Sequence, residues 1–154
     1  MRLFLDKDGG DLAQLTASRL IPGNVPGWGR PELILVHGLD PSPACFRDLI
    51  AYLGDAFNIY LFRYPVDQSI AESAADLAAV LPSARYEFNI CSVDMGALVT
   101  RACMADESFK GGVKRLLMIA PPNHGADLAR LRFVLEFGDV FADMQTEGRE
   151  LRQA

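Results

Sequence analysis

The 154-residue sequence lacks a concentration of basic side chains, since 15 lysines and arginines face 20 acidic residues and the formal net charge is -5. Nucleic acids and anionic membrane surfaces are bound through clustered positive charge, so neither is an expected partner. The chain also lacks an apolar run of the roughly 20 residues that cross a bilayer, and its N-terminus turns acidic too early for a secretory signal. We expect a cytoplasmic, globular protein with no integral membrane segment.

Cysteine and histidine are scarce as well, with three and two residues respectively. The cysteines are Cys45, Cys91 and Cys103. Their odd number, unpaired spacing and apolar surroundings are typical of reduced, buried thiols. The acidic turn that begins at Asp6 departs from a calcium loop, because Asp11 stands where the loop needs its glycine and Ala17 where it needs its glutamate. We expect neither a metal nor a cofactor.

Apolar runs and turn residues alternate regularly from residue 32 onward, and this alternation predicts strands followed by helices. The predicted strands cover 32–36, 57–64, 87–92 and 113–120, and the predicted helices cover 42–53, 69–81, 95–105 and 126–137. Leu98, Ala102 and Ala105 are the expected inward residues of the third helix. Residues 1–31 form an N-terminal extension with a candidate helix over 12–20, and 32–154 form the core of one partial domain spanning 1–154.

Strand–helix alternation with short loops predicts parallel strands joined by right-handed crossovers. The expected fold is therefore α/β, an open, mostly parallel sheet with helices on both faces. Sites in such sheets lie at the carboxyl ends of the strands, where the chain order reverses. If the second strand lies outside the first and the third on its other side, the turn at 37–39 faces the turn at Asp94.

The turn after the third strand reads Ser92-Val93-Asp94-Met95-Gly96, with small residues two positions either side of Asp94. A strand that bends abruptly into a helix strains its apex residue, and only small neighbours avoid a collision there. Together with the segments 36–39 and 119–128, this turn resembles the lipase and esterase branch of the α/β-hydrolase superfamily. The resemblance extends from residue 32 to about residue 153, and it implies the α/β-hydrolase fold with its C-terminal strands missing.

The resemblance places Asp94 at the position of the family's serine nucleophile, and it assigns the backbone N–H groups of Met95 and Leu39 to the oxyanion hole. It implies a small-molecule or lipid ester as substrate. A carboxylate needs no base to attack, but its attack on an ester carbonyl would give a reactive anhydride instead of a stable acyl-enzyme. The acid and histidine of the family's triad follow later strands, and this chain ends before them. We therefore expect an esterase frame without esterase activity.

The two histidines lie in the other resembling segments. His37 stands in the family's structural His-Gly turn, where bracing the turn is the expected role. His124 follows the fourth strand, on the edge of the sheet where a base toward Asp94 or a water would lie.

Two other functions remain open. The first is a hydrolase with an aspartate nucleophile that attacks a halide or an epoxide, although such relatives usually carry tryptophan where this chain has Met95. The second is a non-catalytic binding module that uses the same cleft, with Trp28 and the loop around Asp67 at its rim; otherwise Trp28 is expected to anchor its loop by packing. The apolar run 116–120 predicts an open sheet edge and self-association.

Overall fold

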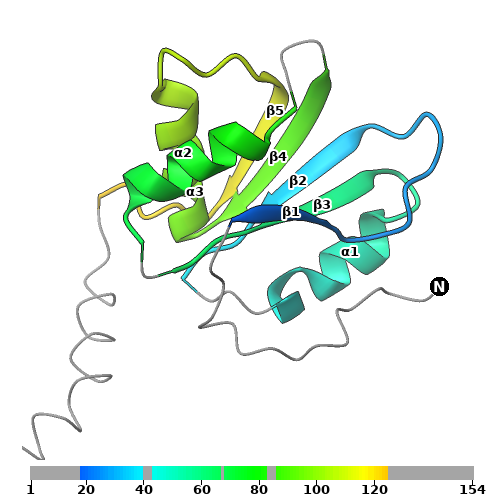
Figure 1. Cartoon of the computed structure of the whole chain (residues 1–154). Coiled ribbons are helices and arrows are strands. Elements are labelled where there is room, and N and C mark those ends of the chain that lie inside the picture. The colour runs from blue at the N-terminus through cyan, green and yellow to red at the C-terminus, as the bar shows by residue number, and fades with distance from the viewer. Residues whose placement is uncertain (1–17, 40–42, 67, 83–85, 125–154) are drawn as a thin grey trace, which may run out of the picture. The chain divides into compact units, whose positions relative to one another are not determined.

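A computed structural model of the chain describes residues 18–39, 43–66, 68–82 and 86–124, and these contain a five-stranded sheet in the order β1-β3-β2-β4-β5 (Figure 1). The strands are β1 (Arg19–Pro22), β2 (Glu32–Val36), β3 (Asn58–Arg63), β4 (Glu87–Val93) and β5 (Gly112–Ile119). β2 pairs in parallel with both β3 and β4, β5 pairs in parallel with β4, and β1 is antiparallel to β3. The predicted open, mostly parallel α/β sheet is confirmed.

Helices cover both faces of this sheet, as predicted (Figure 1). α2 (Ile70–Val80) and α3 (Met95–Ala105) pack on one face, and α1 (Arg47–Leu53), which continues the 3₁₀ turn Pro43–Phe46, packs on the other. The fourth predicted helix, 126–137, lies outside the described residues.

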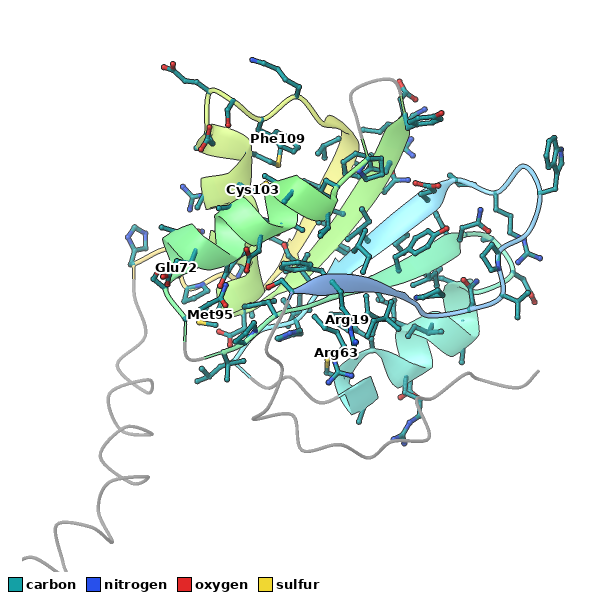
Figure 2. The ribbon with its side chains drawn as sticks, in the orientation of Figure 1. Arg19, Arg63, Glu72, Met95, Cys103 and Phe109 are labelled. Atoms are coloured by element: carbon teal, nitrogen blue, oxygen red, sulfur yellow. The ribbon has the colours of Figure 1, made fainter. Side chains whose placement is uncertain are left out.

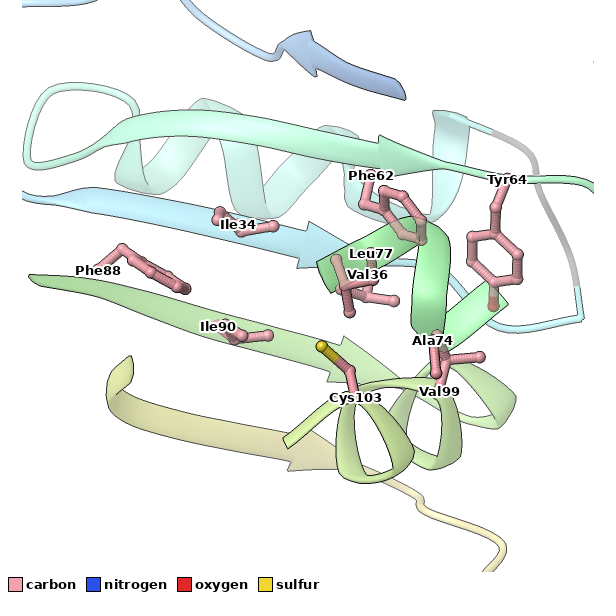
Figure 3. Packing of buried hydrophobic residues seen from close by; sticks show 10 residues of the cluster. All are labelled: Ile34, Val36, Phe62, Tyr64, Ala74, Leu77, Phe88, Ile90, Val99 and Cys103. Atoms are coloured by element: carbon pink, nitrogen blue, oxygen red, sulfur yellow. The ribbon is translucent and has the colours of Figure 1, made fainter. Parts of the chain in front are cut away.

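The central strand β2 explains why both faces need a cover. Its side chains alternate between the faces, and Leu33, Ile34, Leu35 and Val36 are all buried. Ile34 and Val36 join the cluster under α2 and α3, which Figure 3 shows with Phe62, Leu77 and Val99 among its members. A continuous apolar run of this kind is typical of a strand covered on both sides.

The N-terminal strand corrects one prediction. Arg19 and Leu20 fall within β1, where a helix over 12–20 was expected, and Arg19 stands opposite Arg63 on β3 (Figure 2). The strand is short and lies at the edge of the described sheet, where Pro22 is tolerated because no further strand among the described residues needs its missing N–H. The pairing with β3 determines the strand conformation of this segment, and a local pattern of four residues could not reveal that pairing.

The inward face of α3 is also rotated relative to the prediction. Gly96, Val99 and Cys103 are its buried residues together with Ala97 and Thr100. Ala102 is half-buried and packs against the core cluster, as predicted, whereas Leu98 is half-buried outside that cluster and Ala105 is exposed. The backbone of α3 approaches the carbonyls of Val36 and His37 closely at Gly96, so the helix face that carries Gly96 is the one turned inward.

The cysteine prediction holds for two of the three thiols. Cys91 and Cys103 are buried and reduced, and burial, followed by the charge of Asp106, raises the pKa of Cys103 to about 11. Cys45 is exposed, contrary to the prediction. It lies in the 3₁₀ turn that precedes α1, where Phe46 turns inward instead.

Two further findings concern the described part of the chain. None of its helices has the length and apolar content that crossing a bilayer requires. The chain divides into two compact units, 1–122 and 123–154, and of the second only Asn123 and His124 are described. Both side chains are exposed.

Candidate active site

The bend between β4 and α3 is as sharp as the small-residue pattern predicts. Asp94 stands between Val93, the last residue of β4, and Met95, the first of α3, with φ 50° and ψ −126°. A positive φ is uncommon for a residue other than glycine, so this backbone is strained. It is held by neighbours: the Asp94 N–H donates to the Ile119 carbonyl at 2.9 Å, and the Asp94 carbonyl accepts from the Ala97 N–H at 3.0 Å.

Glycine is required on both sides of the contact between this bend and the turn after β2. A Cβ on Gly96 would overlap the His37 carbonyl oxygen and lie 2.7 Å from that of Val36. A Cβ on Gly38 would lie 2.7 Å from both Cβ and Oδ2 of Asp94. The bend therefore packs its backbone at Gly96 against the carbonyls of Val36 and His37, and its Asp94 side chain against Gly38. This contact follows from the predicted strand order β3-β2-β4.

This packing brings two of the residues singled out from the sequence into contact. The Leu39 N–H donates to Asp94 Oδ2 at 3.2 Å, and the Asp94 side chain is half-buried. Met95 begins α3, a position whose N–H has no acceptor within an α-helix. The Asp94 side chain makes no capping hydrogen bond to the first turn of α3.

A second layer of contacts surrounds the turn at 37–39. His37 is buried, and its Nδ1 lies 2.8 Å from the Gly38 carbonyl oxygen. The Tyr64 hydroxyl donates to the His37 carbonyl at 2.8 Å, and the two rings stack with centroids 4.2 Å apart. These contacts agree with the expected turn-bracing role of His37. Burial, and secondly the nearby charge of Asp94, raises the pKa of Tyr64 above its usual value.

Sequence reasoning overlooked Tyr64, although a signal was present. An aromatic residue with a polar tip closes the predicted strand 57–64, just before Pro65. The carboxyl end of a parallel strand is where the site was expected, and a buried tyrosine hydroxyl usually finds a partner nearby.

Trp28 does not lie at this site, contrary to the prediction. Trp28 lies on the loop before β2, at the amino ends of the parallel strands, whereas Asp94 follows the carboxyl end of β4. Its side chain is fully exposed, at 104%. It is therefore neither at the rim of the site nor a packed anchor of its loop. Asp67 lies outside the described residues, and His124 belongs to the second compact unit, 123–154.

The side-chain amide of Asn24 helps to anchor the loop that carries Trp28. Asn24 Nδ2 donates to the carbonyls of Gly54 and Phe57 at 2.7 and 2.8 Å, and its Oδ1 accepts from the Ile59 N–H at 2.8 Å. One asparagine side chain thus ties the loop to the end of α1 and the start of β3.

No cluster of three or more metal-ligating side chains occurs within the described ranges. The chemistry that the described site can offer is that of a carboxylate, a backbone N–H donor and a buried phenol.

The sheet order and the cover of helices on both faces define an α/β fold. Among solved structures the chain is similar to the Bacillus licheniformis lipase BlEst2 in its mature form, with a TM-score of 0.59 and 20% identity over 74% of this chain and 51% of that one. The propeptide form of the same lipase gives a TM-score of 0.58 and 21% identity over 73% of this chain and 27% of that one. This chain thus spans about half the length of the mature lipase. No protein-family model and no curated protein sequence matches it.

Proposed function

We propose that this chain is a lipase- or esterase-type α/β-hydrolase domain whose substrate class is carboxylic esters and whose Asp94 prevents their turnover. One observation carries the proposal: the Asp94 carboxylate stands at the strained apex between β4 and α3 and accepts the Leu39 N–H at 3.2 Å. In an esterase that N–H stabilises the oxyanion of the tetrahedral intermediate, with the Met95 N–H as its second donor.

The inactivity follows from charge and from the bond that would form. The carboxylate already occupies the donor that a developing oxyanion would need, and its negative charge opposes a second one there. Attack of a carboxylate oxygen on an ester carbonyl would expel an alkoxide and leave a mixed anhydride, a poorer intermediate than an acyl-serine.

The test is hydrolysis of p-nitrophenyl esters by the unaltered chain and by Asp94→Asn. Neither protein should release p-nitrophenol faster than buffer does. Hydrolysis by the unaltered chain that disappears in Asp94→Asn would show that Asp94 is a working nucleophile and would overturn the proposal. Asp106→Asn, an exposed aspartate after α3, is the matched control, because it removes the same charge away from the turn.

The same contact favours one alternative, a hydrolase that attacks a saturated carbon. With Oδ2 held by the Leu39 N–H, the other carboxylate oxygen is available to form a C–O bond as the carbon–halogen bond breaks and the halide leaves with the bonding pair. The product is an alkyl ester of Asp94. Incubation with an alkyl bromide followed by peptide mass spectrometry should then place the alkyl group on Asp94, and an unmodified Asp94 peptide would eliminate this function.

A further inference from the structure

We propose that Tyr64 is a positioning residue for this site, which fixes the Leu39 N–H against the side chain at position 94 through His37 and Gly38. The inference deepens the proposed function, because it concerns the amide to which that function assigns the oxyanion.

The first link joins Tyr64 to His37. Tyr64 is 1% exposed, directly after β3, and Figure 3 shows it beside Phe62 at the end of that strand. Its hydroxyl donates to the His37 carbonyl at 2.8 Å, while its ring stacks on the His37 imidazole at an interplanar angle of 11°. The same carbonyl oxygen faces the backbone of α3 at Gly96. His37 is thus held both by its carbonyl and by its ring.

The second link joins His37 to Leu39. Nδ1 of His37 lies 2.8 Å from the Gly38 carbonyl oxygen. A carbonyl oxygen only accepts, so the proton of this hydrogen bond must be on Nδ1. The carbonyl of Gly38 and the N–H of Leu39 belong to one peptide group, and a donor on that carbonyl polarises the N–H. This N–H donates to Asp94 Oδ2.

The hydroxyl, and not merely the ring, is needed for the first link. Phenylalanine could stack on His37 in the same way, but it would leave the buried His37 carbonyl without this donor. Burial, and secondly the charge of Asp94, raises the pKa of Tyr64, which favours the protonated phenol that donates this hydrogen bond.

The experiment compares Tyr64→Phe with Tyr60→Phe by proton–nitrogen NMR of the complete chain. Tyr60 lies on β3, the strand that Tyr64 directly follows, and packs against the same apolar cluster, so its variant removes an equal hydroxyl away from the turn. In Tyr64→Phe the Leu39 amide proton should shift upfield and exchange about fivefold faster, the effect of losing roughly one net hydrogen bond. In Tyr60→Phe neither should change.

An unchanged Leu39 amide in Tyr64→Phe, or equal changes in both variants, would overturn the inference. If Tyr64→Phe does not fold, the coupling between His37 and position 94 is tested with Tyr64 unchanged. Asp94→Asn should then shift the Nδ1 resonance of His37, and an unshifted resonance would refute the coupling. None of these readouts requires ester turnover, so the hydrolysis assay tests the proposed function separately.

Discussion

Replacing Gly38 by alanine tests the contact between the two turns on which the site depends. The three atoms nearest to the new methyl group all belong to Asp94, two of them at 2.7 Å and the third at 3.1 Å. One of the two turns must move to make room, and overpacking of this kind typically costs about 1–3 kcal/mol. The backbone at Gly38 is not left-handed, so no conformational penalty adds to that cost.

The cost should vanish when the side chain at position 94 is removed. Asp94→Gly relieves a positive φ, which is worth about 1–3 kcal/mol. It also loses the hydrogen bond from Leu39, about 1 kcal/mol, and adds about 0.5–1 kcal/mol of backbone entropy to the unfolded state. These terms nearly cancel. Asp94→Gly removes all three of the atoms nearest to the new methyl group, so in this background Gly38→Ala should cost little. The coupling between the two changes should then be about 2 kcal/mol.

Urea unfolding of the four proteins, followed by far-UV circular dichroism, measures this coupling. Tryptophan fluorescence would be a poor probe, because Trp28 is fully exposed in the folded state. Gly29→Ala is the control: it has a positive φ of 77° and no neighbour within 4 Å of its added Cβ, so its cost should not depend on position 94. If Gly38→Ala costs as much with glycine at position 94 as with aspartate, the two turns are not in contact and the reasoning about the site is wrong.

Three further outcomes are expected. Asn24→Ala should lower the free energy of unfolding by about 2 kcal/mol, because the Phe57 carbonyl and the Ile59 N–H lose their hydrogen bonds to its side chain, while the Gly54 carbonyl keeps Arg30 as a donor. Trp28→Ala should change it by less than about 0.5 kcal/mol, and equal effects in urea unfolding would contradict this. Hydrogen bonds from Gln68 and Ser18 lower the pKa of Asp76. The stability that the Asp76 carboxylate contributes is therefore present above its unfolded-state pKa and is lost as pH falls through the lower folded-state pKa. Asp76→Asn should weaken the decrease of the melting temperature at acid pH, and an unchanged decrease would contradict this. Leu117 and Ile119 are 58% and 44% exposed on β5, the outermost strand of the described sheet. The chain should therefore self-associate, as measured by light scattering, and Leu117→Lys should reduce the self-association. A monodisperse monomer would refute the prediction.

Local signals predicted most of the fold. Ser69 was expected to begin a helix, and it caps α2 with Glu72 in a reciprocal capping box. The apolar run at 32–36 coincides with β2, and the breaker Gly54 follows α1. Each of these signals lies within a few residues of the element that it specifies, so the sequence pattern alone contains it.

What the sequence could not reveal depends on contacts between distant segments. β1 forms because β3 offers it a ladder, and β2 and α1 lie between the two strands in the sequence. Tyr64 reaches His37 across 27 residues of sequence. At the site, the small-residue spacing around Asp94 predicted the bend, and the assumed strand order predicted that the two turns face each other. The buried Tyr64 behind them required the packed structure.

The bend at position 94 owes its geometry to its neighbours and not to the side chain that it carries. The two backbone hydrogen bonds that hold it run to Ile119 and from Ala97, and the close approach of Gly96 to His37 involves backbone atoms. A change of residue at position 94 therefore leaves the frame intact, provided that the new residue tolerates a positive φ. The same backbone would present a hydroxyl or a carboxylate to the Leu39 N–H. The fold can thus persist while the reaction changes with one side chain, so the α/β fold and the chemistry at Asp94 are separate questions.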